Sequence, residues 1–160
     1  MRRSFTFLLT LFAVAVARPA DGPFDFNALS RRAQELAAAP YRLRSRPMPE
    51  WLKQLDYDKY RDIRFRGPES WWNHDPVPFK LQFFHPGFIY TGTVQVFELN
   101  HGQPSLIPFS TSLFDYGPIK VGALPPDFGF GGIRINYALN KPGDELGTFQ
   151  GASYFRFLCR

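Results

Sequence analysis

The sequence has 160 residues and a formal net charge of +5 at pH 7, and 44% of its residues are hydrophobic and 18% aromatic. So many apolar side chains exclude an intrinsically disordered chain and a coiled coil, because they require burial in a packed core. The 13 glycines and 15 prolines are spread without a repeat, which disfavours an all-helical bundle and favours short strands joined by turns.

Residues 1–17 have the pattern of a secretory signal peptide. Arg2 and Arg3 precede an apolar stretch that ends in the small residues Ala15 and Ala17. That stretch is shorter than the roughly twenty residues of a membrane-spanning helix. We therefore expect export, by the general secretory or the twin-arginine route, and no stable membrane insertion once the signal is removed.

The sequence predicts no metal site and no cofactor. Cys159 is the only cysteine, which excludes an intramolecular disulfide and a zinc site built on cysteines. The three histidines, His74, His85 and His101, are scattered without a metal-ligand spacing, and we expect them in loops.

The arginines are concentrated early in the chain. Eight of the twelve that follow Arg3 lie between residues 31 and 66, where acidic residues interleave with them. Phosphate binding needs an uncompensated basic stripe, so the pattern favours a mixed-charge surface and no nucleic-acid partner. Arginine beside aromatic residues can also recognise sugars, because its planar group donates to paired hydroxyls and stacks on rings.

The first elements of the mature chain are predicted to be helical. Apolar residues recur at helical spacing after Asp25, which can cap a helix as Asn27 also can, and Pro40 would end it. An N-terminal helical segment and connector is expected over residues 18–60. Its helices are predicted at residues 25–39, 49–54 and 56–60.

From residue 61 onwards the pattern changes to strands and turns. The stretch from Asn100 to Gln103 contains His101-Gly102 and is a strong hairpin signal. Short strands with turn signals about every eight to twelve residues favour an antiparallel sandwich or barrel. Strands are predicted at residues 61–66, 79–84, 91–99, 105–109, 132–139 and 146–158.

Ordered sequence blocks carry a resemblance to a known family. Their order and spacing resemble the start of the periplasmic glucans biosynthesis protein family, of the MdoG/OpgG and OpgD type, over about residues 24–160. The blocks are Leu55–Arg66, Leu81–His85, Phe128–Arg134 with Leu139-Asn140, Asp144-Glu145 and Gly151–Arg156.

The resemblance implies an exported protein of the Gram-negative periplasm that takes part in making osmoregulated periplasmic glucans, whose backbone is β-1,2-linked. It implies an all-β fold, an antiparallel β-sandwich resembling galactose mutarotase with short N-terminal helices. Residues 61–160 would supply only the first strands of that sandwich, so the domain would be truncated. Some family members are regarded as β-1,2-glucan hydrolases, with catalytic acids in the later part of the sandwich, so no catalytic residue is assigned to this chain.

Sugar binding is the local role that the residues favour, because aromatic rings stack on pyranose faces while polar neighbours bind hydroxyls. The candidates are Trp71, Trp72, Tyr154 and Arg156, and for each of them packing in the core is the competing interpretation. Strand alternation sends Tyr154 and Phe155 to opposite faces, so at most one of these two can line a groove.

Two acidic residues, Asp127 and Asp144, follow proline or glycine. They are interpreted as turn residues whose side chains bond backbone N–H groups.

Three functional hypotheses remain at this stage. The first is a periplasmic protein that binds, and in its full-length form cleaves, β-glucan together with partners in glucan assembly. The second is a non-catalytic glucan-binding or scaffold module, and the third is an inactive truncated remnant. Whether the chain is an enzyme is left open.

Overall fold

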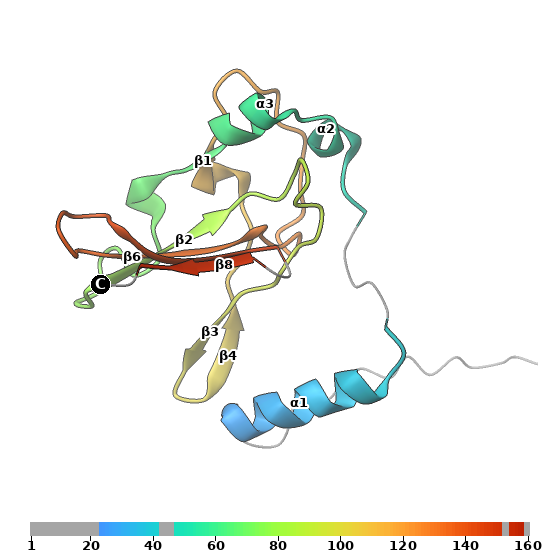
Figure 1. The fold of residues 1–160 in the computed structure, drawn as a ribbon, viewed down its shortest axis with the longest axis vertical. Helices are drawn as coiled ribbons and strands as arrows, with labels where there is room; N and C mark the ends of the chain where they lie inside the picture. Colours follow the sequence, from blue (N-terminus) through green and yellow to red (C-terminus); the bar gives the residue numbers. More distant parts are fainter. Residues whose placement is uncertain (1–22, 42–46, 152–153, 159–160) are drawn as a thin grey trace, which may run out of the picture.

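The computed structural model describes residues 23–41, 47–151 and 154–158 (Figure 1). The expected signal peptide at residues 1–17 and the single cysteine Cys159 lie outside the described residues. The chain forms antiparallel sheets with a few short helices, which confirms the all-β fold class. Its elements are α1 (Phe26–Ala38), α2 (Glu50–Lys53), α3 (Tyr57–Asp62), β1 (Arg64–Phe65), η1 (Gly67–Glu69), β2 (Phe79–Phe84), β3 (Phe97–Asn100), β4 (Gln103–Leu106), η2 (Thr111–Leu113), β5 (Phe114–Asp115), β6 (Gly132–Tyr137), β7 (Glu145–Gln150) and β8 (Tyr154–Phe157).

The three predicted helices are confirmed, and aspartates cap two of them. Asp25 accepts a hydrogen bond of 2.7 Å from the backbone N–H of Ala28 at the start of α1. Asp56 accepts one of 2.8 Å from Lys59 at the start of α3. In the described part of the chain, no helix has the length and apolar character needed to cross a membrane.

Helix α1 lies apart from the core. None of its residues is buried, and Phe26 is 79% exposed. Just before the helix, the backbone N–H of Phe24 donates to the carbonyl of Gly102 over 2.6 Å. This bond holds the start of α1 beside the tip of the β3–β4 hairpin, below the sheet in Figure 1.

Four strands form the main sheet in the order β2-β6-β7-β8, all antiparallel. Sequence analysis placed strands at 79–84 and 132–139, and β2 and β6 confirm them. The single strand expected over 146–158 is wrong, because the chain turns at Gly151, whose φ of +62° favours glycine. The resulting hairpin places β8 at the edge of the sheet.

Two other predicted strands are shorter in the structure. The strand expected over residues 61–66 is reduced to the two residues of β1, because the helix capped by Asp56 continues to Asp62. Residues 91–99 form a strand only from Phe97, and before it Val94 makes an isolated bridge with Phe130. The expected hairpin is confirmed, with His101 at φ +49° and Gly102 at φ +79° in its turn.

The core lies between this sheet and a second layer that contains the β1–β5 ribbon. Phe83 of β2 stacks on the fully buried Phe130, with ring centroids 4.2 Å apart. From the ribbon, Phe65 packs edge-on against Phe83 at 5.7 Å and against Phe114 at 5.4 Å. This two-layer packing of sheets around aromatic rings is sandwich-like.

The apolar face of the sheet extends further than the second layer. Phe149 pairs across the strands with Ile133 on one side and with Phe155 on the other, so all three share the face on which Phe83 lies. Phe155 is nevertheless 70% exposed, and Phe157 on the same strand is also exposed. The β7–β8 end therefore presents uncovered aromatic rings.

His85 directly follows β2 and lies outside the helices and strands, as expected, but its side chain is buried. Its Nδ1–H donates to the carbonyl of Pro86 over 2.6 Å, which leaves Nε2 to accept the hydroxyl of Tyr116 at 2.8 Å. The ring also packs edge-on against Phe114 at 4.9 Å. Burial among these groups disfavours the imidazolium and lowers the pKa of His85 to about 4.

A loop with two tryptophans joins the core to the β3–β4 hairpin. Trp71 and Trp72 are half-buried, and both indole N–H groups donate to the same Oε1 of Glu98, at 3.1 and 2.8 Å. Glu98 lies on β3, whereas the two tryptophans precede β2. One carboxylate therefore links two segments that are far apart in the sequence.

We expect the stability of the chain to depend on the protonation of His85. An unfolded histidine binds a proton below about pH 6.5, but folded His85 does so only near pH 4, so its stabilising contribution is complete above pH 6.5 and falls as the pH drops. Between pH 7 and pH 5 this amounts to about 2 kcal/mol of unfolding free energy. Urea titrations at the two pH values should show a smaller loss in the His85→Gln variant than in the unmodified chain. The exposed His74→Gln control should keep the full loss, and equal pH dependence in all three proteins would contradict the assignment.

We also expect Glu98→Ala to destabilise the chain by about 2 kcal/mol, because two half-buried indole N–H groups lose their acceptor. Urea unfolding measures the loss, and amide hydrogen exchange should accelerate in β3 and β4. Glu69→Ala, which removes an exposed carboxylate, is the matched control and should change the stability by less than about 0.5 kcal/mol. Unchanged exchange in the hairpin of the Glu98 variant would show that the carboxylate does not hold it.

Candidate functional site

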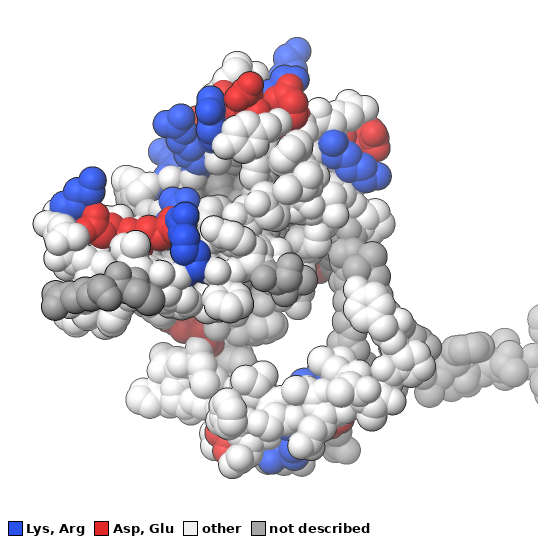
Figure 2. All heavy atoms as spheres, viewed as in Figure 1, with Lys and Arg blue, Asp and Glu red and all other residues white. Residues whose placement is uncertain are grey.

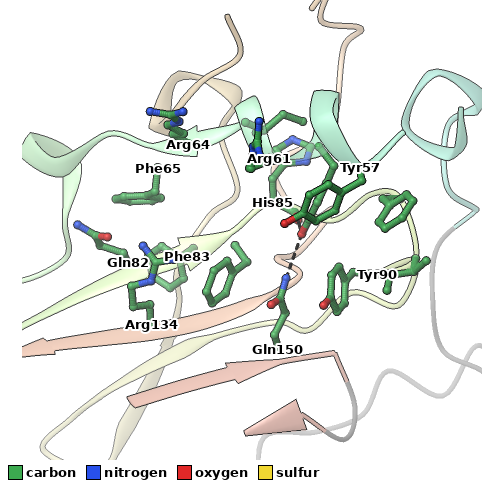
Figure 3. Close-up of a pocket in the computed structure, with 15 residues that line it drawn as sticks. Tyr57, Arg61, Arg64, Phe65, Gln82, Phe83, His85, Tyr90, Arg134 and Gln150 are labelled. Carbon is green, nitrogen blue, oxygen red and sulfur yellow. Dashed lines mark hydrogen bonds between the residues drawn. The ribbon is translucent and has the colours of Figure 1, made fainter. Parts of the chain in front are cut away.

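A cavity of about 710 Å³ lies between the α3–β1 segment and the sheet. In Figure 3, Arg61 and Arg64 lie on the α3–β1 side of the cavity, and Gln82 and Arg134 rise from the strands on the opposite side. The cavity thus lies mainly over the face of the sheet that carries Gln82 and Arg134, and Phe83, whose ring packs in the core, also borders it.

The alternation of β2 explains the floor of the cavity. Phe83 points into the core, so Gln82 and Phe84 point to the other face. Gln82 pairs across the strands with Arg134, which brings that arginine to the same face. The guanidinium of Arg134 lies 4.8 Å from the centre of the Phe84 ring, and Gln82 is held by a 3.0 Å bond to the hydroxyl of Ser70.

Four aromatic rings form one wall. Tyr60 stacks on Phe88 with centroids 6.1 Å apart and contacts Tyr90 at 5.7 Å. Tyr57 meets Phe88 edge-on at 6.2 Å, and this tyrosine is 60% exposed. The wall combines two segments, α3 and the loop after β2, and leaves part of its ring surface open to solvent.

The conformation of Phe88 is uncommon for a bulky residue, with φ at +54°. Backbone bonds hold it there: its N–H donates to the carbonyl of Leu52 over 3.2 Å, and the N–H of Gly87 donates to the carbonyl of Tyr90 over 2.9 Å. Left-handed backbone in non-glycine residues is unfavourable and clusters at functional sites. The fold therefore maintains a strained residue where it supplies a ring to the cavity.

The hydroxyl of Tyr60 connects the wall to the sheet. It donates to the backbone carbonyl of His85 over 2.8 Å and accepts the amide N–H of Gln150 over 3.1 Å, the bond drawn in Figure 3. Burial raises the pKa of Tyr60 to about 12, so the hydroxyl stays neutral at physiological pH. Tyr60 is thus a structural link, and its neighbour Tyr57 is the freer ring.

An ion-pair network borders the cavity on the sheet. Glu145 pairs with Arg134 at 2.9 Å and with Arg156, so one carboxylate serves two guanidinium groups. Partial burial by itself would raise the pKa of Glu145, but the hydrogen bond from Arg156 and the charge of Arg134 outweigh it and hold the pKa below its usual value. Glu145 therefore stays ionised, and the network has a net positive charge.

The residues present determine what the cavity can do chemically. Among the described residues that line it, none is an aspartate or glutamate, so this lining lacks the pair of carboxylates on which glycoside hydrolysis commonly depends. The described residues also contain no group of three or more potential metal ligands. Rings, amides and guanidinium groups remain, and these are suited to binding.

The residues proposed from the sequence fall into two groups. Tyr154 pairs with Gln150, and Arg156 is joined to Arg134 through Glu145, so both lie on the cavity face of the sheet next to the lining. Trp71 and Trp72 lie elsewhere, packed against the core, with their N–H groups bound to Glu98.

Sequence reasoning did not find the residues that line the cavity. Tyr57, Tyr60, Phe88 and Tyr90 come from two segments that are separated by β1 and β2, and only the fold brings them together. The loop after β2 did contain a local signal, because two of these aromatic residues, Phe88 and Tyr90, lie close together in it. The other interpretation from the sequence, that Asp144 is a turn residue, is confirmed: its Oδ2 accepts the N–H groups of Asn140 and Lys141 at 2.9 and 3.1 Å.

Comparisons with known proteins give a consistent result. The family model described as periplasmic glucan biosynthesis protein, MdoG, matches residues 24–160. Proteins named glucans biosynthesis protein G are similar to the chain: the one from Ralstonia nicotianae is 42% identical over 91% of the chain and 29% of its own length. Those from Vibrio cholerae and Rhodopseudomonas palustris are 39% and 37% identical, over 86% and 92% of the chain and 26% and 30% of their own lengths. The chain spans about three tenths of these relatives.

We expect Tyr60→Phe to lower the unfolding free energy by about 1 kcal/mol, because the change removes one hydrogen bond to the His85 carbonyl and one from Gln150. Tyr57→Phe is the matched control, since no hydrogen bond of the Tyr57 hydroxyl is present among the described residues. Urea unfolding of the two variants compares them directly. Equal stability of the two would show that the link between wall and sheet contributes nothing.

Proposed function

The chain belongs to the MdoG family of periplasmic glucan biosynthesis proteins, and from that premise we propose that its cavity binds β-glucan chains in the periplasm. One observation carries the proposal: a cavity of about 710 Å³ combines open aromatic rings with arginine and glutamine side chains, and the described residues of its lining include no carboxylate. This combination suits a ligand with apolar ring faces and many hydroxyl groups.

The wall and the floor would act on different parts of a sugar. The exposed ring of Tyr57 and the adjacent Phe88 offer faces on which the apolar side of a pyranose stacks. Gln82 and Arg134 on the opposite side supply N–H donors to its hydroxyls. A glucose unit would therefore lie between α3 and the sheet.

The residues predicted from the sequence extend this proposal. Tyr154 and Arg156 would continue the binding surface along the sheet towards β8. The ring faces of Trp71 and Trp72 would form a separate contact for a longer glucan. Residues 1–17 would direct export to the periplasm, where glucan and the partners of its assembly are met.

We expect the chain to bind linear β-1,2-glucan oligosaccharides, and Tyr57→Ala to weaken the affinity about tenfold by removing a stacking platform. Isothermal titration calorimetry measures both. Tyr41→Ala is the matched control, because Tyr41 is also exposed but does not line the cavity. Tyr154→Ala and Trp72→Phe in the same titration test the two extensions of the site.

Two outcomes of these experiments would contradict the proposal. No heat of binding from a folded chain would favour an inactive remnant. New reducing ends released from the glucan by the chain would point to hydrolysis, and thus to carboxylates outside the lining of this cavity. Binding without cleavage supports the glucan-binding module.

A further inference from the structure

Helix α1 has an apolar stripe that is exposed to solvent. Phe26, Leu29, Ala33 and Leu36 recur at spacings of three and four residues, which places them on one side of the helix. None of the residues of α1 is buried, and Phe26, Leu29 and Leu36 are all exposed. Exposed apolar side chains that lie together mark a contact surface for a membrane or for another molecule.

The position of α1 keeps this stripe accessible. The helix lies below the sheet in Figure 1, and the bond from Phe24 to the carbonyl of Gly102 holds its start beside the tip of the β3–β4 hairpin. That hairpin exposes Phe97 and Leu99, which share one face of β3 because side chains alternate along a strand. Figure 2 shows largely uncharged atoms over α1, whereas charged groups gather over α3 and the sheet. This end of the molecule is therefore predominantly apolar.

The sequence around the stripe has a positive charge. Between residues 26 and 49 it contains five arginines and one acidic residue, Glu35, which gives a formal net charge of +4. Within α1, Arg32 pairs with Glu35 at 3.3 Å, and both side chains are exposed. Arg31 adds a second positive charge to the helix. The helix therefore combines an apolar side with an excess of arginine elsewhere on its surface.

This combination favours a lipid surface as the occupant of the stripe. Helices that lie in the interface of a bilayer place apolar side chains at the boundary of the acyl chains and basic side chains among anionic headgroups. An arginine close to an anionic lipid surface strengthens binding about fivefold. A protein groove would use the stripe alone, whereas an anionic bilayer uses both the stripe and the arginines.

We propose that α1 docks on the surface of a lipid bilayer that contains anionic headgroups, with Phe26, Leu29 and Leu36 in its interfacial layer. The 13 residues of α1 are fewer than the roughly twenty that span a bilayer, so the helix lies along the surface. This attachment is reversible and differs from the stable insertion that the sequence disfavours. It is independent of the proposed glucan binding, because no residue of α1 lines the cavity.

Co-sedimentation of the exported chain with lipid vesicles tests the proposal. The form used is the one from which residues 1–17 have been cleaved, as checked by mass spectrometry, because those residues contain another apolar stretch. One set of vesicles is phosphatidylcholine, and the other is an equal mixture of phosphatidylcholine and phosphatidylglycerol. We expect the partition coefficient to be about tenfold higher on the mixed vesicles at low salt, and the difference to shrink as salt is added.

Two variants of α1 separate the apolar from the electrostatic contribution. Phe26→Gln should lower the partition onto mixed vesicles about tenfold, because an aromatic ring no longer enters the interface. Arg31→Gln should lower it about fivefold and weaken its salt dependence. Phe155→Gln is the matched control, because Phe155 is an exposed phenylalanine on β8, and it should leave the partition unchanged. Urea unfolding should be the same for Phe26→Gln as for the unmodified chain, since Phe26 is not buried.

Three outcomes would overturn the proposal or a part of it. No partition of the folded chain onto mixed vesicles would exclude the lipid surface and leave a protein partner as the occupant of α1. Loss of partition in Phe155→Gln, with none in Phe26→Gln, would place the contact at β8. Equal partition onto the two sets of vesicles would show that the arginines contribute nothing. None of these results would affect the glucan titrations, which address the cavity.

Discussion

The pleat of β2 is the constraint on which the rest of the structure depends. Because successive side chains point to opposite faces, one six-residue strand supplies Phe83 to the core and Gln82 to the cavity. The stack of Phe83 on Phe130 fixes the position of β2 relative to the core. Because β6 pairs with β2 in a fixed register, the position of Arg134 on the cavity face is fixed as well. A register slip of one residue would exchange core and cavity along the whole strand.

The residues just after β2 connect the core to the wall of the cavity. His85 is locked in the core by Tyr116 while its carbonyl accepts the hydroxyl of Tyr60. The chain then passes through the left-handed Phe88, which stacks on the same tyrosine ring. The wall therefore depends on the core through a short run of chain, and a ligand that stacks on it would meet a preorganised surface, which lowers the entropic cost of binding.

Local patterns predicted most of the elements, and the exceptions have physical causes. The Asp25 cap, the His101-Gly102 turn and the strand at residues 79–84 are signals contained within a few residues, and each is confirmed. The Asp56 cap also explains the error at residues 61–66, since a capped helix overrode the local alternation. The cavity could not be predicted in this way, because Tyr57 and Phe88 become neighbours only through tertiary packing. The block Leu55–Arg66 contains Tyr57 and Tyr60, but the family resemblance assigned neither of them to a site.

The positions of the three tryptophans make them fluorescence probes of different parts of the fold. Trp51 lies 6.2 Å from the ring of His85 and 6.5 Å from that of Tyr116, whereas both other indoles are bound to one carboxylate near the β3–β4 hairpin. Imidazolium quenches indole fluorescence at short range, so the fluorescence of Trp51 should report the protonation of His85. The fluorescence of Trp71 and Trp72 should report the conformation of the β3–β4 hairpin. Single-tryptophan versions of the chain would thus distinguish, by fluorescence, disturbance of the core from disturbance of its periphery.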